Sequence, residues 1–116
     1  FMIVQYAAAS AISQNKQLAT PASVDSIDSS NGQEDHVSMG ANAATKLKRV
    51  VDNFEKIVGI EWLSACQALH FRDYKTSSSI KAKIDVFREK VPFVAEDQFM
   101  QPLMEASRQF VVKEEL

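Results

Sequence analysis

The longest proline-free stretch of this chain predicts one helix that is unusually long for so small a protein. No proline occurs between Pro21 and Pro92, and from Leu47 to Leu69 apolar residues recur at three- and four-residue steps. We predict a helix over residues 35–71. At ~1.5 Å per residue, the part from His36 to Leu69 alone would be about 50 Å long. Its apolar positions are Leu47, Val50, Val51, Phe54, Ile57, Val58, Trp62, Ala65 and Leu69.

The rest of a 116-residue chain is too short to cover a helix of this length. A compact domain of about this size has a radius of gyration of ~13 Å, so its diameter is well below the length of the helix. We therefore expect the apolar stripe of the helix to meet helices from elsewhere. These would come from the missing remainder of a longer chain or from other subunits.

The first half of the chain is predicted to hold a helix and a functional loop ahead of the long helix. Residues 1–18 are rich in alanine, which favours a helix from about Met2 to Gln17. Residues 19–34 are predicted to form the loop, and Asn31-Gly32 within it is a turn signal. No segment shows convincing two-residue alternation. The predicted fold class is therefore all-α, a segment of a long-helix bundle with a functional loop between its first two helices.

Residues 76–116 are predicted to form the C-terminal helices. One runs from about Ile80 to Lys90, with Ser79 as its N-cap. The other covers about Asp97 to Val112, where Pro102 suits a first-turn position. Within the long helix, Gly59 weakens the interior by about 1 kcal/mol relative to alanine, which favours a bend there.

The composition excludes several classes of partner. A net charge of −2 provides no basic surface for nucleic acid or for an anionic membrane, and no apolar run approaches the ~20 residues that span a bilayer. A single cysteine, Cys66, excludes an internal disulfide and suits the cytoplasm; it is expected to be buried and inert. The chain opens on Phe1 in an uncapped apolar helical pattern, so we expect a piece of a longer protein.

The loop region contains possible metal ligands, but their spacing does not fit a metal site. If Gly32 is placed at position six of an EF-hand loop, Ile27 falls at position one and Ser38 at position twelve, so the pattern fails. The zinc motif HExxH is also absent. We therefore predict no metal. The possible ligands are Asp25, Asp28, Glu34, Asp35 and His36.

Glu34 is the residue to single out in this loop. From spacing alone it is a solvated carboxylate near the start of the long helix, where the helix dipole favours negative charge. Asp35 is better placed as a helix cap than as a catalytic acid. His36 in the first turn would act as a neutral hydrogen-bonding support for the Glu34 loop, and Gln33 would be a further supporting residue.

Several runs of the sequence resemble the aromatic amino-acid lyase family, and within it the histidine ammonia-lyases. The closest match is Gln33-Glu34-Asp35-His36-Val37-Ser38-Met39-Gly40. The resemblance covers about the first two-thirds of the chain well and the rest only in pattern. Its other runs are Gln5 to Ala9, Asn15-Lys16, Pro21 to Ile27, Glu61 to Leu69 and Phe71-Arg72.

The resemblance implies that Glu34 is both a catalytic and a substrate-binding residue. In the family the matching position faces the substrate side chain; histidine lyases carry Glu there, and phenylalanine and tyrosine lyases typically carry Gln. A carboxylate pairs with an imidazole N–H or an imidazolium, whereas a phenyl ring offers no such donor. Gln33, Asp35 and His36 are predicted from their places beside Glu34 to support it.

The expected function is that of the C-terminal part of a histidine ammonia-lyase, which converts L-histidine to trans-urocanate and ammonia. The family uses the electrophile 4-methylideneimidazole-5-one (MIO), formed from an Ala-Ser-Gly tripeptide that this chain lacks. A tyrosine base is also expected outside this sequence. The expected partners are the remainder of the parent chain and three further copies in a homotetramer, and the fragment alone is expected to be inactive. The alternatives are another aromatic amino-acid lyase, an aminomutase, or a freestanding helical interaction module.

Overall fold

The computed structural model describes residues 1–22, 24, 26–34, 40–72 and 75–113. In this part of the chain the only strand-like feature is one isolated bridge, between Ser29 and Glu34. The predicted all-α fold is therefore confirmed. The helical elements are α1 (Met2–Leu18), the short 3-10 helix η1 (Ser30–Gly32), α2 (Gly40–His70), α3 (Ser78–Lys90) and α4 (Gln101–Lys113).

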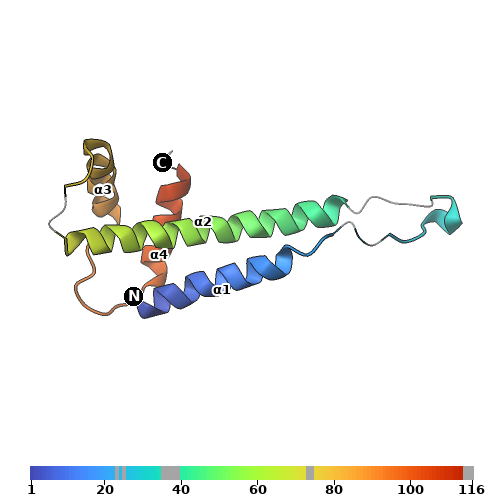
Figure 1. Cartoon of the computed structure of the whole chain (residues 1–116), viewed down its shortest axis with the longest axis horizontal. Coiled ribbons are helices and arrows are strands. Elements are labelled where there is room, and N and C mark those ends of the chain that lie inside the picture. The colour runs from blue at the N-terminus through green and yellow to red at the C-terminus, as the bar shows by residue number, and fades with distance from the viewer. Residues whose placement is uncertain (23, 25, 35–39, 73–74, 114–116) are drawn as a thin grey trace.

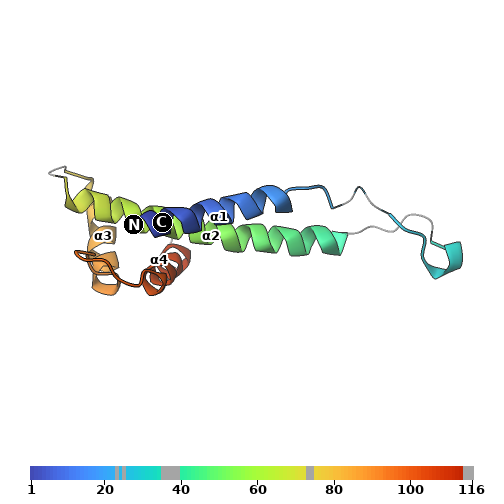
Figure 2. The same cartoon turned by 90° about the horizontal axis from the view of Figure 1, so that it is seen from below.

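The molecule is a rod built on α2 (Figure 1). Its principal extents are 68 × 28 × 21 Å and its radius of gyration is 20.0 Å, well above the ~13 Å of a compact domain. Helix α2 has 31 residues, which corresponds to about 46 Å. Helix α1 runs antiparallel beside α2, α4 crosses it, and α3 lies at its C-terminal end (Figures 1 and 2).

The C-terminal half of α2 forms the hydrophobic core together with α3 and α4. Trp62 stacks on Phe110 at a centroid distance of 6.0 Å and meets the ring of Phe87 edge-on at 6.0 Å. The side chain of Gln67 holds the connection between α3 and α4 against α2: its Nε2 donates to the Val94 carbonyl at 2.8 Å, and its Oε1 accepts from the Val94 N–H at 3.3 Å. The buried members of this core are Leu63, Cys66, Phe87, Val91 and Phe110.

Gly59 lies where α4 crosses α2. A Cβ at this position would lie 2.7 Å from Cα of Arg108, which is too close for any side chain. The Ser107 hydroxyl, fully buried, donates to the Gly59 carbonyl at 2.6 Å. The role of the glycine is therefore to let two helix backbones approach, and the bend expected from sequence is not what explains it.

Helix α1 pairs with α2 mainly through a cluster of polar side chains, and few apolar side chains are buried between the two helices. The Asn53 amide, itself buried, donates to Oε1 of Gln14 at 2.7 Å and to Oδ1 of Asn15 at 2.9 Å. Nearer the start of α1, Val4 is buried. This arrangement fixes the register of the two helices.

Two predicted helix boundaries were wrong. The N-cap of α3 is Ser77, whose Oγ accepts from the Ile80 N–H at 3.2 Å, whereas Ser79 is already inside the helix. The last helix begins at Gln101, four residues after the predicted Asp97. Pro102 does fall in its first turn. The predicted start of the long helix, over 35–39, lies outside the described residues.

The predicted uncovered apolar stripe is present on the N-terminal half of α2. Leu47, Val51 and Phe54 share one face at steps of four and three residues and are 62%, 45% and 59% exposed. We call these three residues the α2 stripe. No described helix combines the length and apolar character needed to cross a membrane.

Candidate functional site

The loop between α1 and α2 turns back on itself at residues 29–34, which we call the loop tip. Ser29 and Glu34 exchange two backbone hydrogen bonds, each 3.4 Å long. The three residues after Ser29 adopt left-handed backbone, with φ of 53° at Ser30, 58° at Asn31 and 78° at Gly32. Asparagine and glycine tolerate this region best, so the Asn31-Gly32 turn signal is confirmed.

The Glu34 carboxylate is held from one side by a serine. Oγ of Ser29 donates to Oε2 of Glu34 at 2.9 Å, while no described residue donates to Oε1. Glu34 is exposed and Ser29 is half-buried. Within the described part of the chain, the loop tip therefore presents a carboxylate with one oxygen engaged and no donor on the other.

Of the predicted site residues, Gln33 and Glu34 lie in the described part of the loop. Gln33 follows the left-handed turn, and its N–H donates to the Ser30 carbonyl at 3.2 Å, so it adjoins Glu34 on the loop tip. Its side chain is exposed. Asp35 and His36 lie outside the described residues, and their predicted supporting roles stay predictions.

The loop tip lies at the far end of the rod, beyond α1 and α2 (Figure 1). The base of the loop is fastened to α2 by Lys46, whose Nζ donates to the carbonyl and, at 2.9 Å, to the hydroxyl of Thr20. The core around Phe87 lies at the other end of α2. Among the described residues, Ser29 is the side chain that contacts the Glu34 carboxylate, and no second catalytic group lies beside it.

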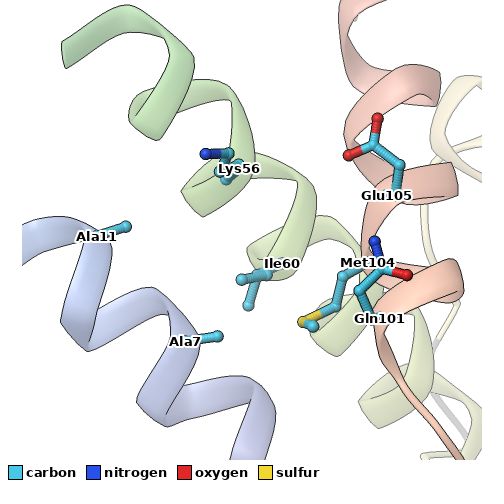
Figure 3. A pocket seen from close by; sticks show the side chains of 7 residues that line it. All are labelled: Ala7, Ala11, Lys56, Ile60, Gln101, Met104 and Glu105. Atoms are coloured by element: carbon cyan, nitrogen blue, oxygen red, sulfur yellow. The ribbon is translucent and has the colours of Figure 1, made fainter. Parts of the chain in front are cut away.

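A separate hollow of about 200 Å³ lies between α1, α2 and α4 (Figure 3). Its one acidic group is already engaged: Arg108 and Gln109 donate hydrogen bonds to Glu105 and lower the pKa of that carboxyl to about 2. Such a group is a poor general acid or base at neutral pH. The hollow is lined by Ala7, Ala11, Lys56, Ile60, Gln101, Met104 and Glu105.

The described residues contain no group of three or more histidine, cysteine and acidic side chains placed to hold a metal ion. Cys66 is buried as predicted, and burial raises the pKa of its thiol, against the opposing charge of Arg88. A protonated, buried thiol is a weak nucleophile.

The residues of this chain do not fit the formation of MIO. Three Ala-Ser pairs occur, beginning at Ala9, Ala22 and Ala106, and none is followed by glycine. Of their serines, Ser107 is committed to the contact between α2 and α4.

The sequence model of the family described as "Aromatic amino acid lyase" matches residues 1–89, which include α1, the loop tip and α2. The chain belongs to the aromatic amino acid lyase family. Aromatic amino acid lyases that remove ammonia are carbon–nitrogen lyases. Membership of this family disfavours the alternative of a freestanding helical interaction module.

Curated relatives in the lyase family carry the name histidine ammonia-lyase. The chain is 49% identical over 114 residues to the protein of that name from Natranaerobius thermophilus, covering 97% of this chain and 22% of the relative. It is 50% identical over 102 residues to histidine ammonia-lyase 1 of Fusobacterium nucleatum, covering 86% of this chain and 20% of the relative. The chain thus spans about a fifth of the length of these lyases.

Solved structures of the lyase fold share its helical arrangement. Histidine ammonia-lyase from Trypanosoma cruzi superposes with a TM-score of 0.89 at 38% identity, covering 94% of this chain and 22% of that one. The ergothioneine degrading enzyme ergothionase from Treponema denticola superposes with a TM-score of 0.79 at 32% identity, covering 88% and 21%. The family is therefore established, and the substrate within it is left open.

Ser29 is the one site residue that the sequence did not reveal. Serine is common in this loop, and four residues lie between Ser29 and Glu34. The available signal was Asn31-Gly32, because a turn centred there brings the residues on its two sides together.

Proposed function

We propose that this chain is the part of a histidine ammonia-lyase that supplies the Glu34 carboxylate to the imidazole of the substrate. The complete enzyme would eliminate ammonia from L-histidine and release trans-urocanate. The observation that carries the proposal is the loop tip, which presents an exposed carboxylate with one oxygen available, in a Gln33-Glu34-Asp35-His36 run inside the family match.

The chemistry of the carboxylate supports histidine as the substrate. An imidazole N–H donates a hydrogen bond to a carboxylate oxygen, and an imidazolium adds a charge to that bond. A site that bonds a polar group rejects substrates that lack the group far more strongly than an apolar pocket would. The names of the relatives at 49% and 50% identity support the same substrate.

The rest of the reaction needs groups that this chain does not contain. The family uses an MIO group, and this chain has no tripeptide to form it. We propose that the MIO group and the proton-abstracting tyrosine belong to the remainder of a longer chain and that the complete enzyme is a homotetramer. Purified alone, the 116-residue chain is expected to form no urocanate from histidine, as followed by ultraviolet absorbance. Steady turnover by the purified chain would show that the catalytic groups do not lie outside it, and this part of the proposal would be wrong.

The test of Glu34 is Glu34→Gln in the full-length enzyme, which keeps the shape of the side chain and removes its charge. A charge-assisted hydrogen bond contributes ~1.5–3 kcal/mol, so kcat/KM on histidine should fall roughly ten- to a hundredfold or more. The loss on tyrosine should be smaller, because its ring offers no N–H to the carboxylate. The melting temperature should not change.

The matched control is Asp28→Asn, which removes an exposed carboxylate from the same loop. It should leave kcat/KM on histidine within about twofold of wild type, as expected for a surface charge. If Glu34→Gln behaves like this control, Glu34 is only a solvated carboxylate and the proposal is wrong.

The ergothionase neighbour supports a second candidate, in which the substrate is ergothioneine. That molecule is a histidine derivative, so a carboxylate facing its ring is compatible with both substrates. Comparing kcat/KM of the full-length enzyme on histidine and on ergothioneine decides between them. A different aromatic amino-acid lyase or an aminomutase would instead favour phenylalanine or tyrosine, or retain the amino group in the product.

A further inference from the structure

We propose that Ser29 is the positioning residue for Glu34, which aims the carboxylate by occupying one of its oxygens and leaving the other for the substrate. The inference rests on the proposed function, because it assigns a partner to the residue that would meet the substrate ring. It assigns a role in that function to a second side chain, Ser29.

Two independent contacts join Ser29 to Glu34. The side-chain bond runs from Oγ of Ser29 to Oε2 of Glu34 at 2.9 Å. The two backbones are also paired in both directions, at 3.4 Å each. The hydroxyl and the carboxylate therefore start from Cα atoms whose separation is fixed by the backbone pairing, so only side-chain rotation decides whether the two groups meet.

The left-handed turn at residues 30–32 brings Ser29 back beside Glu34. The Gly32 N–H donates to the Ser29 carbonyl at 3.1 Å, and φ at Gly32 is +78°, a region that suits glycine. Ser29 is half-buried and Glu34 is exposed, so the carboxylate stays accessible while it accepts the hydrogen bond from the serine hydroxyl.

A serine in this place performs a task that the glutamate cannot perform alone. A glutamate side chain has three rotatable bonds, and an exposed carboxylate samples many orientations. A hydrogen bond to an ionised oxygen is shorter and stronger than one between neutral groups, so it selects one orientation before the substrate arrives. Pre-organisation of this kind lowers the cost of binding and of reaching the transition state.

The experiment is a double-mutant cycle in the full-length lyase, with kcat and KM measured on histidine. Ser29→Ala should lower kcat/KM about two- to tenfold, the range expected for one net hydrogen bond. Ser29→Thr keeps the hydroxyl and should restore most of the loss. Ser26→Ala, an exposed serine of the same loop, is the matched control and should behave as wild type. Melting temperatures should agree across the set.

The second arm introduces Ser29→Ala into the Glu34→Ala enzyme, which has no carboxylate to aim. There the serine substitution should change kcat/KM by less than about twofold, because the two residues act as one unit. Equal losses in both backgrounds, or wild-type kinetics for Ser29→Ala, would overturn the role of Ser29 alone. Wild-type kinetics for Glu34→Ala would instead overturn the proposed function.

Discussion

The two halves of α2 have neighbours of different kinds. From Gly59 onward the helix packs against α3 and α4, and Leu63 in that half and Phe87 of α3 are 0% exposed. Before Gly59 it lies along α1, with Asn53 in a polar cluster, and the α2 stripe faces outward. One half therefore completes its own core and the other does not.

The difference shows which part of the rod is self-sufficient. Burial of aromatic and aliphatic side chains is the main source of stability, whereas hydrogen bonds between polar side chains mostly fix geometry. The C-terminal half of α2 contributes Leu63 and Cys66 to the hydrophobic core of this chain. The N-terminal half, which leads to the loop tip, exposes apolar side chains that a longer chain or a second copy would cover.

The largest expected contrast comes from the same substitution made in the two halves. Phe87→Ala removes a fully buried ring and should reduce the free energy of unfolding by about 3–5 kcal/mol. Phe54→Ala deletes the same atoms from a ring that is 59% exposed and should change the stability far less. The measurement is urea unfolding of the 116-residue chain, followed by the fluorescence of its one tryptophan, Trp62, which contacts Phe87. Equal losses would remove the distinction between the halves.

The next effect concerns association through the α2 stripe. At micromolar concentration the chain should self-associate in sedimentation experiments. Replacing Leu47, Val51 and Phe54 together with glutamine should weaken the association by about tenfold or more, because apolar burial drives it. The control carries glutamine at three exposed apolar positions outside the stripe, Val24, Ile80 and Phe99. If the wild-type chain is a monomer with a cooperative melt, the α2 stripe does not drive association and the prediction is wrong.

The smallest effect is a pH dependence in the α4 region. Hydrogen bonds from Arg108 and Gln109 lower the pKa of Glu105 from 4.5 to about 2. A carboxyl with a lowered folded-state pKa stabilises the fold above pH 4.5, and this contribution is lost as the pH falls from 4.5 toward 2. Because the side chain is 38% exposed, we expect at most about 1 kcal/mol.

Glu105→Gln should remove that contribution when urea midpoints are compared with wild type between neutral and acid pH. Asp85→Asn is the control: it breaks an ion pair with Lys81 whose side chains are 62% and 67% exposed. It should alter the pH profile less than Glu105→Gln. A larger change for Asp85 would mean that the contacts of Glu105 are no stronger than those of a surface pair.

Much of the fold followed from hydrophobic spacing, because a helix buries side chains at regular steps. The long α2, the helical class, the buried Cys66 and the uncovered stripe were all predicted in this way. The N-cap of α3 was misplaced by two residues, because residues 77–79 are all serine and only the backbone of the last turn of the loop distinguishes them. Gly59 was recognised as unusual, but its reason lies in α4, 48 residues along the chain at Ser107.

The candidate site was predictable only in part. Glu34 was selected by a family motif, and that assignment stays a prediction. Ser29 was missed because its contact depends on three successive left-handed residues, a geometry that no periodicity reports. Groups contributed by other parts of a lyase leave no trace in these 116 residues.

The crossing at Gly59 has a consequence for how such sequences tolerate insertions. Arg108 of α4 pairs with Glu55 at 2.7 Å one turn before the point where Ser107 meets Gly59. One residue inserted between Glu55 and Gly59 would turn the two positions by about 100° relative to each other and separate them along the helix by a further ~1.5 Å, so α4 could no longer engage both. Length changes in the connection between α3 and α4 carry no such constraint once the chain has passed Val94, which Gln67 holds against α2. Insertions among natural relatives should therefore be excluded from residues 55–59 and tolerated in the connection at residues 95–99.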